Sequence, residues 1–157
     1  MSTSDDALRL GAIGENLYRN IKTAMGHNIQ GSLDPYDSDM DMTCDGMTVE
    51  VKTQQRFHTM NRFTIKDTQL RKCSKVDILV VIETPHKLSG DIARVFEYPI
   101  KTRMFSRQTQ LIGGVWKYTL RPDDGNIIAE IGDLETLNLL RRYSNSYHDR
   151  FKLEESS

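Results

Sequence analysis

Apolar residues recur at helical spacing in two parts of the chain. Over residues 5–25, Leu8, Ile13, Leu17 and Ile21 mark one side of an amphipathic helix that Gly26 would end. Near the other end of the chain, Leu134, Leu137 and Leu140 predict a helix over residues 133–143, with Asp133 as its N-cap and all three leucines facing inward. A third, shorter helix is expected over residues 65–74, which are rich in Lys and Arg.

Strand patterns lie between these helices. Residues 76–82 form the most apolar run of the chain, which predicts a strand that is buried on both faces. Residues 92–98 and 115–120 predict two further strands, and we expect Trp116 in the latter to lie in the core.

A β-hairpin is predicted over residues 39–53. Met47, Val49 and Val51 alternate with polar residues that include Glu50 and Lys52. The dipeptide Asp45-Gly46 precedes this alternation and is a strong signal for a two-residue hairpin turn.

The order helix, hairpin, helix, strands, helix predicts one mixed α/β domain over residues 1–157, with residues 146–157 as a frayed tail. The length of 157 residues fits a single domain, and 38% hydrophobic with 27% charged residues is typical of globular proteins. No run of 18 apolar residues predicts a membrane span, and the polar, acidic start does not resemble a secretory signal. Cys44 and Cys73 form no CxxC motif, which favours reduced thiols in an intracellular protein.

The net charge of −1 hides a strong segregation of charge. Residues 1–50 carry a net charge of −6, residues 51–121 carry +9, and residues 122–157 carry −4. An acidic cluster is able to bind a hard cation and a basic segment is able to attract phosphate, so near neutrality does not exclude a nucleic-acid partner.

The hairpin brings candidate chemistry together. Glu50 and Lys52 share one face of a strand about 6–7 Å apart, and Asp41 lies at a similar depth across the turn. Carboxylate oxygens, together with a main-chain carbonyl such as that of Val51, are the ligands that Mg²⁺ prefers. A neighbouring lysine is able to position a water molecule and to offset negative charge.

Asp41, followed nine residues later by Glu50-Val51-Lys52, resembles the core motif of the PD-(D/E)XK nuclease superfamily. Glu15 in the first helix resembles the glutamate that many members direct at the metal, and Gln54 matches the (D/E)xKxQ extension. The literal Pro-Asp of the motif is absent, because Pro35 is followed by Tyr36 and Asp37, and Asp39 therefore remains the alternative to Asp41.

This resemblance implies a restriction-endonuclease-like core, with a central mixed β-sheet flanked by helices. It also implies a DNA endonuclease that depends on Mg²⁺ or Mn²⁺ and is specific for a site or a structure, as in homing, restriction or phage genome-processing enzymes. Asp41, Glu50 and the Val51 carbonyl would then hold the metal, Lys52 would position the water, and Glu15 and Gln54 would support them.

Basic residues after the motif are the candidates for DNA contact: Arg56, Arg62, Lys66, Arg71, Lys72 and Lys75. A second group, Lys101, Arg103, Arg107 and Lys117, continues the basic segment. Cutting two strands requires two active sites, so a homodimer or higher homo-oligomer is expected. The expected location is the cytoplasm or nucleoid of a bacterial or phage-infected cell.

Other interpretations remain open. A Holliday junction resolvase is one alternative, and a nucleic-acid-binding protein that keeps the fold without turnover is another; an RNA substrate also fits. A surface hairpin with charges paired across its strands would explain Glu50 and Lys52 but not the aspartate cluster. A calcium loop does not fit, because its glycine position holds Met42 and its glutamate position holds Thr48. The four histidines have no zinc-site spacing.

Overall fold

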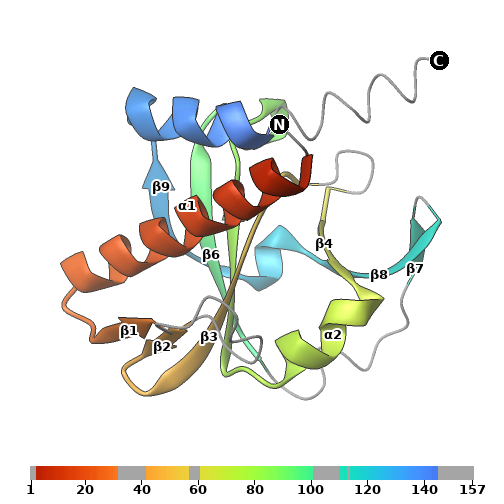
Figure 1. Ribbon diagram of the computed structural model, residues 1–157, viewed down its shortest axis with the longest axis horizontal. Coiled ribbons are helices and arrows are strands. Elements are labelled where there is room, and N and C mark those ends of the chain that lie inside the picture. The colour runs from red at the N-terminus through yellow and green to blue at the C-terminus, as the bar shows by residue number, and fades with distance from the viewer. Residues whose placement is uncertain (1–2, 32–41, 57–60, 101–109, 113, 145–157) are drawn as a thin grey trace.

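A central sheet of six strands, in the order β1-β2-β3-β5-β6-β9, organises the protein. The structure is a computed structural model that describes residues 3–31, 42–56, 61–100, 110–112 and 114–144 (Figure 1). The strands are β1 (Ile29–Gly31), β2 (Met42–Cys44), β3 (Met47–Gln54), β5 (Ile78–Glu83), β6 (Ala93–Pro99) and β9 (Asn126–Ile131). Among these strands β3 and β5 pair in parallel and the other described pairs are antiparallel, so the sheet is mixed, as predicted.

A second sheet of three strands, β4-β8-β7, lies to one side of the first (Figure 1). It contains β4 (Phe63–Lys66), β7 (Gln110–Ile112) and β8 (Val115–Leu120), and the short helix α2 (Asp67–Ser74) follows β4. The expected helix over residues 65–74 is therefore correct from Asp67 onward, and residues 65–66 belong to a strand. Two 3₁₀ turns, η1 (Lys87–Ser89) and η2 (Pro122–Asp124), lie in the described connections.

Helix α1 (Thr3–Ala24) crosses one face of the central sheet (Figure 1). Its Tyr18 is fully buried with Val49, Val51, Val80 and Ile82 of β3 and β5. A β-carbon at Gly14 would overlap the side-chain oxygen of Thr53, so a residue without a side chain lets α1 approach β3 closely. This helix was predicted, although Leu8 on its expected apolar side is 74% exposed.

The opposite face of the central sheet is covered by the second sheet and α2. Phe63, Phe96, Tyr98 and Leu120 are among the buried residues of this core, and Phe63 meets Phe96 edge to face at 5.2 Å between ring centres. Strand β5 carries both cores, because Leu79 and Val81 point to one and Val80 and Ile82 to the other. The predicted burial of this strand on both faces is confirmed.

Among the described residues, the helix nearest the C-terminus covers residues 134–144 (Figure 1). Asp133 caps it by accepting a hydrogen bond from the Thr136 amide at 3.0 Å. The pKa of the Asp133 carboxyl is lowered, first by a hydrogen bond from the Thr136 side chain and then by this amide. The cap and the burial of Leu137 and Leu140 are confirmed. The expectation that Leu134 faces inward is wrong, because it is 71% exposed, and so is the expectation of a buried Trp116, which is 53% exposed.

The hairpin turn was predicted correctly. Asp45 and Gly46 both have positive φ, 51° and 85°, as a type I′ turn requires, and Met42 pairs with Val49 across it. Asp45 also ties β1 to the turn, because its Oδ1 accepts a hydrogen bond from the Asn28 amide at 2.8 Å and its Oδ2 lies 2.6 Å from Nδ1 of His27. These hydrogen bonds, led by the one from the Asn28 amide, hold the pKa of Asp45 below its ordinary value.

Replacing Asp45 with Asn should remove a pH-dependent part of the stability. A lowered folded-state pKa adds stability above the unfolded pKa of about 3.9, and that stability is lost as the pH falls through the folded value. Asn tolerates the positive φ of this position, so the turn itself is kept. Urea unfolding between pH 7 and pH 2.5 should show the variant less stable at neutral pH and the two proteins converging in acid. A difference between them that stays constant across this range would contradict the assignment.

Candidate functional site

Strand β3 separates an apolar face from a charged one. Val49 and Val51 pack against Tyr18 of α1, so the alternating Glu50 and Lys52 point to the opposite face. The same alternation on the neighbouring strand places Leu79 and Val81 beside them, because Glu50 pairs with Leu79 and Lys52 with Val81. Two charged side chains are thus held among buried neighbours by the register of the sheet.

Glu50 and Lys52 form an ion pair, with Nζ of Lys52 3.0 Å from Oε1 of Glu50. The side chain of Glu50 is 2% exposed and that of Lys52 is 22% exposed. A carboxylate removed from water is costly unless a positive charge compensates it, and Lys52 offsets part of this cost. The predicted convergence of Glu50 and Lys52 on one face is confirmed.

Asp41 and its alternative Asp39 lie outside the described residues. Met42, which follows Asp41 in the chain, begins β2 and pairs with Val49, which precedes Glu50. The role of either aspartate as a metal ligand stays a prediction.

Val51 and Glu15 occupy less direct positions. The side chain of Val51 belongs to the core under α1, and its backbone is part of the ladder with Val80 of β5. Glu15 is partly exposed and follows Gly14, the residue at which α1 approaches Thr53 of β3. Helix α1 covers the face of β3 opposite to Glu50, and the predicted support of the metal by Glu15 stays a prediction.

Gln54 has a clear structural partner. Its side-chain amide donates to the carbonyl of Thr64 at 2.9 Å and accepts from the amide of Thr64 at 3.0 Å. The side-chain amide of Gln54 therefore makes the same pair of hydrogen bonds to the main chain of β4 that the backbone of a neighbouring strand would make. Gln54 joins the second sheet to the end of the strand that carries Glu50 and Lys52.

Arg56 is engaged inside the protein. Its Nε and Nη2 donate to the two oxygens of Glu83 at 2.6 and 3.1 Å, and its Nη1 donates to Asn61 at 2.8 Å. Glu83 ends β5, is fully buried, and also lies 3.2 Å from Nε2 of His86 and 3.9 Å from Nη1 of Arg94. The predicted DNA contact of Arg56 therefore competes with an internal role.

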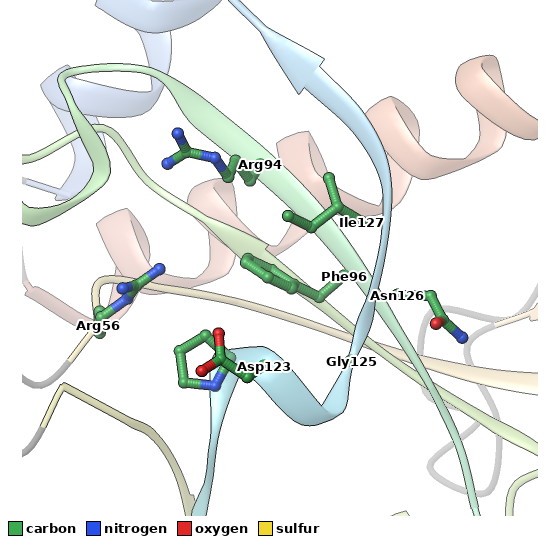
Figure 2. A pocket seen from close by; sticks show the side chains of 8 residues that line it. Arg56, Arg94, Phe96, Asp123, Gly125, Asn126 and Ile127 are labelled. Carbon is green, nitrogen blue, oxygen red and sulfur yellow. The ribbon is translucent and has the colours of Figure 1, made fainter.

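A cavity of about 440 Å³ lies beside this cluster, between β6, β9 and η2 (Figure 2). Figure 2 shows Arg94 on β6 and Arg56 in the connection that follows β3, with Phe96 to one side of both. Both guanidinium groups already face carboxylates, because Glu83 meets both and Arg94 also lies 3.4 Å from Glu130, and Asp123 adds another negative charge to the lining. The cavity is therefore nearly balanced in charge and is a weak site for an anion.

The other candidates for DNA contact are distributed unevenly. Arg62 donates to the hydroxyl of Thr119 at 3.1 Å, whereas Lys66 and Lys75 are exposed. Arg71 and Lys72 belong to α2, but their side chains are not described. In the second group Lys117 lies on β8, and Lys101, Arg103 and Arg107 fall outside the described residues.

Two polar clusters were not anticipated from the sequence. Ligand atoms of His27, Cys44 and Asp45 lie within 4.8 Å of one another, a separation that a metal ion could bridge. Burial raises the pKa of the Cys44 thiol, which disfavours the thiolate that a metal needs, and His27 and Asp45 already fasten the hairpin turn. Residue spacing could not have revealed this group, because β1 and the hairpin pair only in the folded chain.

The second cluster lies under α1. The hydroxyl of Tyr18 donates to Glu97 at 2.6 Å, and Lys22 pairs with the same carboxylate at 3.3 Å. Burial, with the neighbouring Glu97 carboxylate, raises the pKa of Tyr18, so the phenol remains protonated. The three side chains satisfy one another and tie the helix to β6.

Comparisons with models of protein families, with curated proteins and with solved structures gave no match to this chain. Within the described ranges, no helix is long and apolar enough to cross a membrane. The function must therefore be inferred from the site itself.

Replacing Glu83 with Gln should destabilise the fold by about 3–5 kcal/mol, because the change removes the carboxylate that compensates the mostly buried Arg56. The matched control is Glu130→Gln, which removes the exposed partner of Arg94 and should cost less than about 1 kcal/mol. Urea unfolding of both variants measures the difference. Equal losses would show that the Glu83 cluster does not hold the end of β5 and the β3–β4 connection together.

Proposed function

We propose that this protein is a metal-dependent endonuclease that hydrolyses DNA phosphodiester bonds. The observation that carries the proposal is the nearly buried carboxylate of Glu50, paired at 3.0 Å with Lys52 on a strand of the central sheet. A buried carboxylate beside a lysine, two residues apart on one strand, supplies both an oxygen ligand for a hard cation and a positive charge next to it.

The order of elements supports a restriction-endonuclease-like core. A helix, α1, precedes three antiparallel strands, β1, β2 and β3, and the chain then crosses through β4 and α2 to the parallel strand β5. The Glu-Val-Lys triplet lies on the third strand of this series. This is the arrangement that the resemblance to PD-(D/E)XK nucleases implies, and we assign the chain to that core as part of the proposal.

The donor set fits Mg²⁺ or Mn²⁺ better than a thiophilic metal, because it consists of carboxylate and carbonyl oxygens. Glu50 and Asp41 would hold the ion together with the carbonyl of Val51, with Asp39 as the alternative to Asp41. When bound, such an ion polarises the scissile phosphate and lowers the pKa of a coordinated water.

The protein's own groups then have separate tasks. Lys52 orients the attacking water and offsets negative charge on the phosphate, after exchanging part of its contact with Glu50 for the substrate. Water oxygen bonds to phosphorus, the bond to the leaving oxygen breaks, and that oxygen takes up a proton, giving a phosphate monoester and an alcohol. Gln54 acts through structure, since it fixes β4 next to the reacting strand.

Two copies are needed to cut both strands of a duplex, so the proposal includes a homodimer or a higher homo-oligomer acting on DNA inside a bacterial or phage-infected cell. The direct test is incubation with linear, supercoiled, single-stranded and four-way-junction DNA and with RNA, in Mg²⁺, in Mn²⁺ and in EDTA. Cleavage that requires the metal supports the proposal, and a strong preference for the junction selects a resolvase. DNA binding without cleavage in any metal would instead favour a binding protein that keeps the fold without turnover.

Changing Glu50 to Gln or Lys52 to Ala should lower metal-dependent cleavage by at least about 100-fold, because each change removes a group that holds the metal or stabilises the transition state. Glu130→Gln and Lys87→Ala are the matched controls, since both residues are exposed and lie outside the site. Initial cleavage rates measure the effect, and thermal melting confirms that each variant is folded. A folded Glu50→Gln protein that cuts DNA at the wild-type rate would refute the assignment.

A further inference from the structure

The three-stranded sheet has two unlike faces. Phe63, Ile65, Tyr118 and Leu120 are buried in the core against the central sheet. Because side chains alternate along each strand, the intervening residues lie on the outer face. On β4 and β8 these are Thr64, Lys66, Val115, Lys117 and Thr119.

Lys66 and Lys117 are direct partners in the register between β4 and β8. Cross-strand partners have β-carbons about 4.5–5.5 Å apart, and like charges in such a pair repel. The pKa of Lys117 is lowered, first by its partial burial and then by the charge of Lys66. In the part of the chain that the structure describes, no carboxylate forms an ion pair with either ammonium group. Two cations are thus partners in the sheet, and neither forms an ion pair with a described side chain.

Arginines extend this arrangement along the sheet. Arg62 lies just before β4, and its Nη1 reaches the hydroxyl of Thr119 on the outer face at 3.1 Å. Arg121 directly follows β8 and is exposed. Both arginines line a small cavity of about 180 Å³, where Asp123 contributes the one carboxylate among the residues that line it.

We propose that this outer surface, the basic face formed by Arg62, Lys66, Lys117 and Arg121, binds the sugar-phosphate backbone of DNA. The inference rests on the proposed function and adds to it a surface outside the strands that carry Glu50 and Lys52. A row of like charges spread along two strands matches a chain of phosphates, and the hydroxyls of Thr64 and Thr119 between them are further donors for phosphate oxygens.

The basic face is connected to the proposed catalytic strand. Gln54 lies two residues after Lys52, about 6–7 Å along β3, and its amide holds the main chain of Thr64 in β4. A strand bound at Glu50 and Lys52 could therefore continue over β4 and β8 without crossing an acidic surface of these two strands. The second sheet then acts as a grip for DNA next to the site of cutting.

The salt dependence of DNA binding tests this directly. Fluorescence anisotropy in EDTA, where cleavage is excluded, measures the affinity of a labelled duplex, and of the single strand of the same sequence, at several salt concentrations. Each phosphate contact contributes about 0.9 to the slope of log K against log salt for a duplex and about 0.7 for a single strand. Lys66→Gln combined with Lys117→Gln should lower the slope by about 1.8 if the face binds duplex DNA, or by about 1.4 if it binds single strands. The DNA form for which the slope falls is the form that the basic face binds.

The matched control is Lys87→Gln combined with Arg142→Gln, which removes the same net charge at exposed positions elsewhere. A slope that falls equally in both double variants, or in neither, would overturn the proposal. Polyglutamate that displaces DNA from the wild type at equal charge concentration would also overturn it, in favour of an acidic protein partner. The results distinguish this proposal from the proposed function. If the protein cuts DNA but the lysine changes leave the slope of log K against log salt unchanged, the basic face is refuted and the nuclease assignment stands. If the lysine changes lower the slope but the wild type never cuts DNA, the nuclease assignment is refuted and the basic face stands.

Discussion

The compensation of one nearly buried carboxylate underlies the arrangement of the site. Glu50 is placed by the register of β3 among buried neighbours, and Lys52, one step further on the same face, supplies the opposite charge at 3.0 Å. The other face of β3 is closed by α1, where Gly14 permits close contact at Thr53. A strand holds the backbone of both residues more precisely than a loop would when a ligand or an ion arrives.

The same principle separates the basic residues into two kinds. Arg56 is matched by the buried Glu83, so it serves the fold and contributes little to an external field. Lys66 and Lys117 are not matched by any carboxylate in the described part of the chain, although the sheet holds them opposite each other. Compensated charges stabilise the end of β5, and uncompensated charges mark the surface that is available to an anionic partner. Sequence position alone does not distinguish them, because all three residues fall in one basic segment.

Local signals carried the predictions that succeeded. The Asp45-Gly46 turn, the alternation on β3, the Asp133 cap and the apolar run of β5 depend on neighbours in the sequence, and the structure has each of them. The elements that were missed depend on distant partners. Strand β1 has three residues and forms through its pairing with β2. Residues 65–66 directly precede a helix in the chain, but they form a strand because they pair with β8. Trp116 was expected in the core, but it lies on β8 opposite Leu111 at an exposed part of the second sheet.

The candidate site followed the same division. Glu50 and Lys52 could be placed on one face from the two-residue period of a strand. Gln54 binds Thr64, 10 residues further along the chain, and Arg56 binds Glu83, 27 residues further along. These residues become neighbours only when β4 and β5 take their places in the fold. The His27, Cys44 and Asp45 group likewise depends on the pairing of β1 with the hairpin.

The most direct test of the metal site is a crystal grown with Mn²⁺ and examined by anomalous diffraction. A site built on Glu50 predicts an anomalous peak at coordination distance from its carboxylate, and predicts that the peak disappears in Glu50→Gln. A peak only at His27, Cys44 and Asp45, with none at Glu50, would contradict the proposed catalytic centre.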